Sequence, residues 1–246
     1  MRYIVLSIVF LAALTLTGQP CSADHIKVFA EDLPPYAYEE KEEAAGFMVD
    51  IVSEILRRLG RDPHMVRLVP WARAMQVLME QKEVILFPVP GNENYQSANR
   101  LIGPVYTTRL NFFCRAGEKG RFTSLEDARK AERISVTRSG YAFETLRGMG
   151  FMNLEESNGH RFDFYKLKAG RASLAVMDQA LFPGFLRRLP RLQPTQFQDT
   201  GITFATVDMY IAFSNDLAPA MVIRWQRMFD AIRADGTYER ILKRYL

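Results

Sequence analysis

The residue types that most often carry catalysis or bind metals are sparse in this chain. Its three histidines, His25, His64 and His160, stand far apart, with no cysteine or acid at metal-ligand spacing. The sequence has no glycine-rich phosphate loop, no G-x-G-x-x-G after a strand and no G-x-S-x-G elbow. We therefore expect the histidines at the surface or at strand edges, and we predict neither a metal nor a cofactor. An enzyme would have to work with carboxylates, tyrosines or arginines alone.

Such groups do gather near the start of the chain. Residues 32–40, DLPPYAYEE, follow the apolar stretch IKVFAE and combine prolines, tyrosines and acids. Proline lacks a backbone donor and resists both helix and central strand, so a stiff turn is predicted there. Another acid, Asp178, ends the apolar run ASLAVMD. A carboxylate at the carboxyl end of a strand is well placed for a cation or an amine, or it caps the following helix.

The elements that must position these groups alternate between strand and helix. Periodicity and composition predict strands at 25–32, 64–70 and 84–89 and helices at 44–60 and 71–82. The run VILFPV is apolar throughout, as in a strand buried on both faces. This alternation implies a parallel sheet with crossover helices.

Two long extended segments, 103–117 and 201–214, interrupt the alternation and enclose a second alternating block. A helical tail, 219–246, is broken near Asp235 and Gly236. We predict an α/β protein with two lobes, each a small mixed sheet flanked by helices, joined by two crossover hinge strands. Lobe 1 comprises 24–109 and 209–246, and lobe 2 comprises 110–208. Lobes that face each other in this way form a cleft that can hinge shut.

Composition excludes several classes of protein. The chain has 246 residues, 48% of them hydrophobic and 24% charged, which is ordinary for globular proteins. The net charge is only +4 and the basic residues are scattered, so we expect no nucleic-acid partner.

The N-terminal segment has the layout of a secretory signal. Arg2 precedes an apolar stretch of about 15 residues and then small residues, which predicts a signal peptide at 1–23 cut after Ala23. Lipidation at Cys21 is the alternative. The apolar run is too short for a membrane anchor, so we expect a periplasmic protein without stable membrane insertion. We also expect the protein to be a monomer. Cys114 is then the remaining thiol, buried in a strand and without a disulfide.

The order and spacing of several segments resemble the bacterial extracellular solute-binding proteins of family 3, the polar amino-acid type. The segments are LPPYAYEE, GFMVDIVSEILRRLG, WARAMQVLMEQKEV, IGPVYTT, RISVTRSGYAFETL, LKAGRASLAVMD and RADGTYERILKRYL. The resemblance implies the two-lobed, hinge-closing fold of the type II periplasmic binding proteins. It also implies capture of a small polar solute and delivery to an ABC-type permease.

In the family, the turn after the first strand presents an aromatic residue to the ligand. The resemblance therefore makes Tyr36 and Tyr38 candidates, beside Glu31 and Asp32, because a stiff aromatic loop gives contact area at low entropic cost. The alternative for Tyr36 is packing under the first helix.

A second cleft aromatic is implied at Trp71, whose alternative role is to cap the core. Arg73 lies two residues further on and could clamp an anion, or it is a solvated helix residue.

The implied anion partner is missing from lobe 1. Amino-acid binders of the family place an arginine before the IGP-type strand, where it grips the ligand's α-carboxylate. Here the matching position falls on Tyr95 or Gln96, and neither is cationic. Arg100 lies too close to the strand. Arg73 or Arg138 would have to supply the charge, since a buried carboxylate without a partner is costly.

In the second lobe, the resemblance implies a ligand-binding turn at Ser139, Gly140 and Tyr141. Their backbone donors would point from a helix N-terminus toward an anion or a carbonyl group, and Ser139 would also cap the helix. Asp178 matches the aspartate that holds the α-ammonium in family members.

We expect a binding protein without chemistry of its own for an amino-acid-like or amine-bearing solute. A dehydratase-like periplasmic enzyme of the cyclohexadienyl or arogenate type, using Asp178 or Glu31 as general acid, is one alternative. A ligand sensor that feeds a signalling protein is another.

Overall fold

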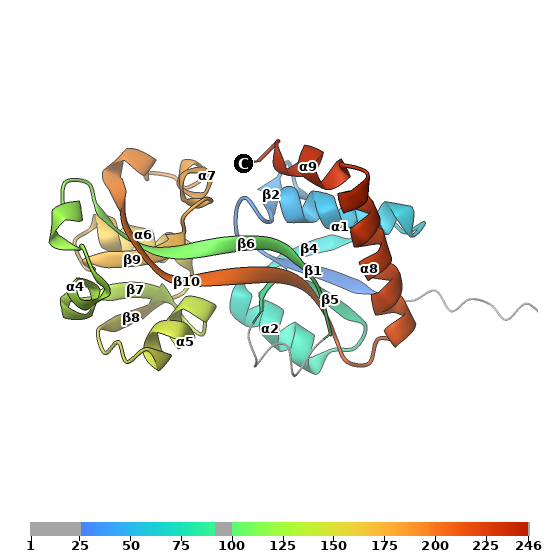
Figure 1. The fold of residues 1–246 in the computed structure, drawn as a ribbon, viewed down its shortest axis with the longest axis horizontal. Coiled ribbons are helices and arrows are strands. Elements are labelled where there is room, and N and C mark those ends of the chain that lie inside the picture. Colours follow the sequence, from blue (N-terminus) through green and yellow to red (C-terminus); the bar gives the residue numbers. More distant parts are fainter. Residues whose placement is uncertain (1–25, 92–99, 246) are drawn as a thin grey trace, which may run out of the picture.

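The chain folds into two lobes joined by two long strands (Figure 1). A computed structural model describes residues 26–91 and 100–245. The predicted signal peptide, His25 and Cys21, and the candidates Tyr95 and Gln96 therefore lie outside the described residues. The two-lobed α/β architecture predicted from the sequence is confirmed.

Lobe 1 is built on a parallel three-stranded unit in the order β4-β1-β5. Its strands are β1 (Lys27–Glu31), β4 (Val66–Val69) and β5 (Val84–Pro90), with the separate hairpin β2 (Tyr38–Glu40) and β3 (Glu43–Ala45). Its helices are α1 (Phe47–Arg58), α2 (Trp71–Glu80), α8 (Pro219–Ala234) and α9 (Thr237–Leu242). All of β5 is buried, as its uniformly apolar sequence predicts.

Lobe 2 repeats the scheme with parallel strands in the order β9-β7-β8. Its strands are β7 (Ile134–Thr137), β8 (Leu154–Ser157) and β9 (Leu174–Asp178). Its helices are α4 (Leu125–Lys130), α5 (Tyr141–Gly148), α6 (His160–Lys168) and α7 (Phe182–Arg187), with single 3-10 turns at Lys119–Arg121 and Pro194–Gln196.

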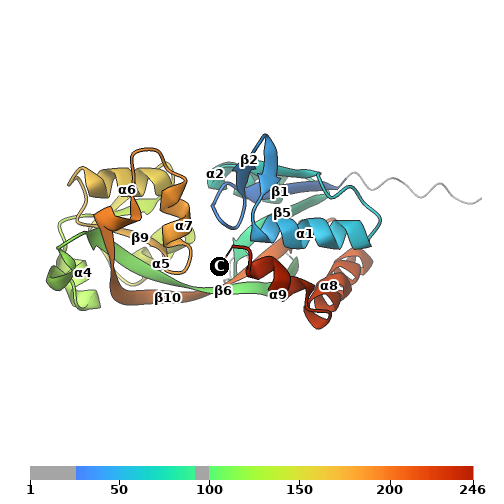
Figure 2. The same cartoon turned by 90° about the horizontal axis from the view of Figure 1, so that it is seen from above.

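The two connecting strands pair with each other along their length. β6 (Arg100–Arg115) and β10 (Phe197–Phe213) are antiparallel, and β10 also pairs with β5 in lobe 1 while β6 pairs with β9 in lobe 2. The two separate sheets expected from the sequence are therefore linked into one eight-stranded ladder, β4-β1-β5-β10-β6-β9-β7-β8. Seen from above, both strands run along one side of the two lobes (Figure 2). The predicted lobe boundaries, at 109/110 and 208/209, fall within these strands.

The turn that carries the N-terminal aromatics is fixed against α1. The helix expected from residue 44 begins instead at Phe47, because Ala44 and Ala45 belong to β3. Gly46 has φ 126°, and a Cβ there would lie 2.4 Å from the Tyr36 carbonyl oxygen. The amide of Phe47 donates to the Pro35 carbonyl at 3.0 Å. These contacts hold residues 35 and 36 against the helix N-terminus.

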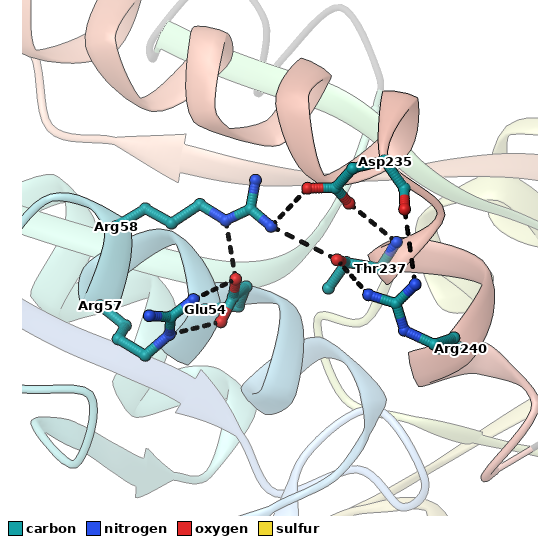
Figure 3. Close-up of polar contacts among 6 residues, drawn as sticks. All are labelled: Glu54, Arg57, Arg58, Asp235, Thr237 and Arg240. Atoms are coloured by element: carbon teal, nitrogen blue, oxygen red, sulfur yellow. Dashed lines mark hydrogen bonds and ion pairs between the residues drawn. The ribbon is translucent and has the colours of Figure 1, made fainter.

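The C-terminal tail returns to lobe 1, as predicted, and an arginine network ties it to α1 (Figure 3). Arg58 donates to Glu54 at 2.7 Å, to Asp235 at 2.6 Å and to Thr237 at 3.3 Å. Arg240 donates to the same threonine at 2.7 Å. The network joins the end of α1 to the break between α8 and α9.

Cys114 is a free cysteine buried in β6, as expected. Within residues 26–91 and 100–245, no helix combines the length and the apolar character needed to cross a bilayer.

An inter-lobe cleft as candidate functional site

Two adjoining spaces lie between the lobes. The inner cavity measures about 80 Å³ and the outer groove about 530 Å³, and both are bordered by Glu31, Trp71, Thr137 and His160. The inner cavity is lined largely by apolar side chains, namely Leu33, Pro88, Pro90, Leu110, Ala142, Val176, Met177 and Met209. Glu31 ends β1 and Thr137 ends β7, so the cleft lies at the carboxyl ends of parallel strands of both lobes.

The deepest polar contact in the cleft joins the two lobes. Tyr36 donates its hydroxyl proton to Asp178 Oδ2 at 2.7 Å, across 142 positions in the sequence. The other carboxylate oxygen accepts from the amides of Ala180 at 3.0 Å and Leu181 at 3.3 Å. Burial raises the pKa of Asp178, and the hydrogen bonds from Tyr36 and the two amides oppose that rise.

Tyr36 and Asp178 each take part in the packing of the protein and also border the cleft. Tyr36 is fully buried with its ring centroid 4.9 Å from that of Phe47 and 5.9 Å from that of Tyr106, so it belongs to the core. It also lines the inner cavity. Asp178 satisfies the turn before α7 and faces the same cavity. A solute that binds Asp178 therefore competes with Tyr36.

A second contact between the lobes involves Trp71. Trp71 is the first residue of α2, as expected, and its side chain is buried. Its indole nitrogen donates to the Ser139 carbonyl oxygen at 2.9 Å, while the side chain borders both spaces. The indole thus borders the cleft and links the lobes.

The pKa of Glu31 differs from that of an ordinary glutamate. Its carboxyl group lies in both spaces, and burial, reinforced by neighbouring Asp32, raises its pKa to about 8. Burial also raises the pKa of Asp32, which the charges of Arg161 and Arg188 oppose. At neutral pH the Glu31 carboxyl is largely protonated, so it can donate a hydrogen bond or a proton.

His160 departs from the expectation that it lies at the surface or at a strand edge. It is the first residue of α6, and it borders both spaces of the cleft. Its Nδ1 is buried 3.8 Å from Asp163 Oδ2. Asp163 is fully buried and accepts from Ser135 at 2.6 Å and Thr137 at 3.0 Å. No sequence pattern indicated this cluster, because its members come from different elements.

At the outer groove, an arginine of lobe 2 contacts two residues of lobe 1. Arg188, at the end of α7, forms an ion pair with Glu40 at 3.1 Å, and its guanidinium carbon lies 3.4 Å from the Tyr38 ring centroid. Tyr38 is buried under this arginine and lines the groove.

Not every predicted residue reaches the cleft. Arg73 is exposed on α2, donates to Gln76 at 2.8 Å, and borders neither space. Arg100 donates to the Leu217 carbonyl oxygen, in keeping with the expectation that it cannot serve the ligand. Arg138 does line the outer groove, where it pairs with Glu156 at 3.1 Å.

The turn before α5 differs from the one expected. Gly140, not Ser139, is the N-cap residue of α5, and no side chain caps this helix. Ser139 is exposed with φ 54°, and the Gly140 amide donates to the Thr137 carbonyl at 3.1 Å. Gly140 and Tyr141 line the inner cavity. The predicted serine cap was wrong because the turn is closed by backbone hydrogen bonds.

The arrangement suits noncovalent capture of a solute. Aromatic rings, carboxyl groups and arginines converge on a space enclosed by both lobes. Among the residues that the structure describes, no group of three or more His, Cys, Asp or Glu side chains could hold a metal ion.

Comparison with known proteins agrees with this geometry. The family model of the bacterial extracellular solute-binding proteins, family 3, matches residues 26–246. No curated protein gives a significant match.

Solved structures of low identity share the fold. A mutant of the arginine-binding protein from T. maritima is 17% identical, with a TM-score of 0.76 over 89% of this chain and 93% of that one. A histidine kinase sensor domain with similarity to periplasmic binding proteins is 20% identical, with a TM-score of 0.78 over 90% and 96%. An ancestral amino acid-binding protein, a precursor of cyclohexadienyl dehydratase, is 16% identical, with a TM-score of 0.72 over 89% and 94%.

Proposed function

The chain belongs to the bacterial extracellular solute-binding proteins of family 3, and we propose that it captures a small polar solute, amino-acid-like or amine-bearing, by hinge closure. It then presents the solute to an ABC-type permease in the inner membrane. The observation that carries this proposal is the cleft itself. Groups from both lobes border it, and the lobes are joined by the paired strands β6 and β10, so the space can open and shut by bending at those strands.

The export of the protein is part of the proposal. Members of an extracellular family are secreted, and the predicted cut after Ala23 would release a periplasmic protein that starts at Asp24. Binding of the solute shifts the population of closed molecules, and a partner reads the change of the outer surface.

A thermal-shift screen of residues 24–246 tests the binding function directly. The screen covers amino acids, polyamines and small organic acids. A ligand at 100 times its dissociation constant stabilises the folded state by about 2.7 kcal/mol, which is readily measured as a higher Tm. A complete library without any stabilising compound would count against the proposal.

The role of Asp178 can be separated from that of the fold. If the amine of the solute binds at Asp178, Asp178→Asn should weaken binding at least about tenfold, because the variant lacks the carboxylate that holds the amine. The asparagine oxygen can still accept from the amides of Ala180 and Leu181, so the turn is kept. Asp230→Asn, on the exposed face of α8, is the matched control. Isothermal titration measures both; unchanged affinity in Asp178→Asn removes this residue from the site.

An enzyme of the dehydratase type is a second candidate, favoured by one observation. The Glu31 carboxyl has a pKa raised to about 8 by burial and faces an apolar cavity, which suits a general acid. Each compound that stabilises the protein would be incubated with it and followed by mass spectrometry. Conversion that depends on Glu31 supports the enzyme; an unchanged compound supports the binding protein.

A ligand sensor that feeds a signalling protein would use the same cleft. Genes for a permease and an ATPase beside this one would support transport, whereas a kinase gene would support sensing.

A further inference from the structure

The two walls of the outer groove carry opposite charges. Two acids of lobe 1, Asp32 and Glu39, line one wall beside the protonated Glu31. Three arginines of lobe 2 line the other wall, namely Arg138, Arg161 and Arg188.

Structural ion pairs use only part of this charge. Arg138 pairs with Glu156, and Arg188 pairs with Glu40, which lies beside the groove. Within the described part of the chain, Arg161 has no ion pair within 4.0 Å, and neither do Asp32 and Glu39. Charges kept unpaired on facing walls remain available to a ligand.

The deeper carboxylate is in a different situation. Both oxygens of Asp178 already accept hydrogen bonds, from Tyr36 and from the Ala180 and Leu181 amides. An incoming ammonium group would have to share or displace them. Asp32 and Glu39 offer no such competition, because among the described residues no hydrogen bond engages their carboxylates.

We propose that the outer groove binds a zwitterion whose cationic group faces the acids of lobe 1 and whose anionic group faces the arginines of lobe 2. This inference rests on the proposed solute-binding function and names the class of its ligand. The polarity is the reverse of that implied by the family resemblance, in which lobe 1 holds the carboxylate and Asp178 of lobe 2 holds the ammonium. With this reversed orientation of the ligand, lobe 1 needs no arginine for the carboxylate. This explains why the matching position holds Tyr95 or Gln96, neither of which is cationic.

The inner cavity indicates that the ligand also has an apolar part. It adjoins the groove at Glu31, Trp71, Thr137 and His160, and its lining is largely apolar. An apolar part of the zwitterion fits there, while both charged ends stay in the groove. A zwitterion that bridges the walls also draws the lobes together, because each end is held by a different lobe.

Probes of equal chain length test the charge requirement. We would measure binding of 6-aminohexanoate, 1,6-diaminohexane and adipate to the protein by thermal shift and calorimetry. The zwitterion is expected to bind at least about tenfold more tightly than the dication or the dianion. A dication or dianion that binds as well as the zwitterion overturns the inference.

Substitutions in the groove test which lobe holds each charged end of the ligand. Arg161→Gln should weaken 6-aminohexanoate about tenfold but leave its methyl ester unaffected, because the ester has no carboxylate. Glu39→Gln should weaken 6-aminohexanoate but not hexanoate, which has no amine. Arg187→Gln, on α7 but outside the groove, is the matched control. The opposite pattern, or no effect of either variant, overturns the inference.

The outcomes also separate this inference from the proposed function. If a compound of the wider library binds while none of the three probes does, or while the groove variants leave its affinity unchanged, the inference fails and solute binding stands. If no compound stabilises the protein, both fail.

Discussion

Two groups of acidic side chains in this molecule face opposite conditions. At the junction of α1, α8 and α9, the hydrogen bonds of Thr237 and Arg58 lower the pKa of Asp235 to about 2, and Arg57 and Arg58 lower that of Glu54 (Figure 3). In the cleft, burial raises the pKa of Glu31 to about 8 and raises that of Asp178. Glu54 and Asp235 are charged and paired, whereas burial opposes the ionisation of Glu31 and Asp178.

The largest effect should come from the residue that links the core to the cleft. Tyr36→Ala removes a fully buried ring from contact with Phe47 and Tyr106, and we expect a loss of about 3–5 kcal/mol in the free energy of unfolding. Urea denaturation measures it.

Tyr36→Phe isolates the hydroxyl group. It keeps the ring but removes the donor to Asp178, so we expect a loss of about 1–3 kcal/mol. Equal losses in both variants would show that the hydrogen bond, and not the packing, dominates at this position.

The raised pKa of Glu31 predicts how the stability of the protein depends on pH. Its carboxyl ionises near pH 4.5 in the unfolded chain and near pH 8 in the folded protein. The folded state therefore holds the extra proton between these values, and its stability falls as the pH rises through this window. We expect Glu31→Gln to gain about 1–3 kcal/mol relative to the wild type between about pH 5 and about pH 9. Denaturation curves at both pH values measure the gain.

Glu54→Gln is the comparison with the opposite sign. The Arg57 hydrogen bond lowers the pKa of Glu54, so its stabilising contribution is present above the unfolded pKa and is lost on acidification. The variant should differ most from the wild type near neutral pH and least in acid. The same direction of change in both variants would contradict the contrast between the two groups.

The smallest effect should come from the partly exposed network around Arg58. Arg58→Ala removes contacts with Glu54, Asp235 and Thr237, and we expect a loss of no more than about 1 kcal/mol, reduced further by salt. Thermal unfolding at low and high ionic strength measures it. Ligand affinity should stay unchanged, because these residues border neither space of the cleft.

The sequence predicted the elements with strong periodicity. Both crossover strands, the apolar β5 and the break near Asp235 lie where expected. The helix predicted at 71–82 is present as α2, but its Met79 is 60% exposed, because the inward face of α2 consists of Trp71, Ala74, Val77 and Leu78. The hairpin of β2 and β3 was missed, since its acids resemble a solvated loop.

The site was harder to predict because its contacts join distant segments. The sequence marked Tyr36, Trp71 and Asp178, but it could not show that Tyr36 would engage Asp178. That pairing depends on how the two lobes face each other. Likewise, nothing in the spacing of His160 placed it beside the cleft, since Asp163, Ser135 and Thr137 become its neighbours only through the packing of α6 on β7.

The shared hydrogen bonds of β6 and β10 have a mechanical consequence. Neither strand can flex without its partner, because twelve residue pairs connect them between Phe197 and Phe213. Three register shifts interrupt this ribbon: Asp199–Thr203 and the adjoining Thr203–Ala205 toward one end, and Met209–Ile211 toward the other. Any swing of the lobes is therefore guided along a single path, and small-angle X-ray scattering would register it as one change in the molecule's overall dimensions.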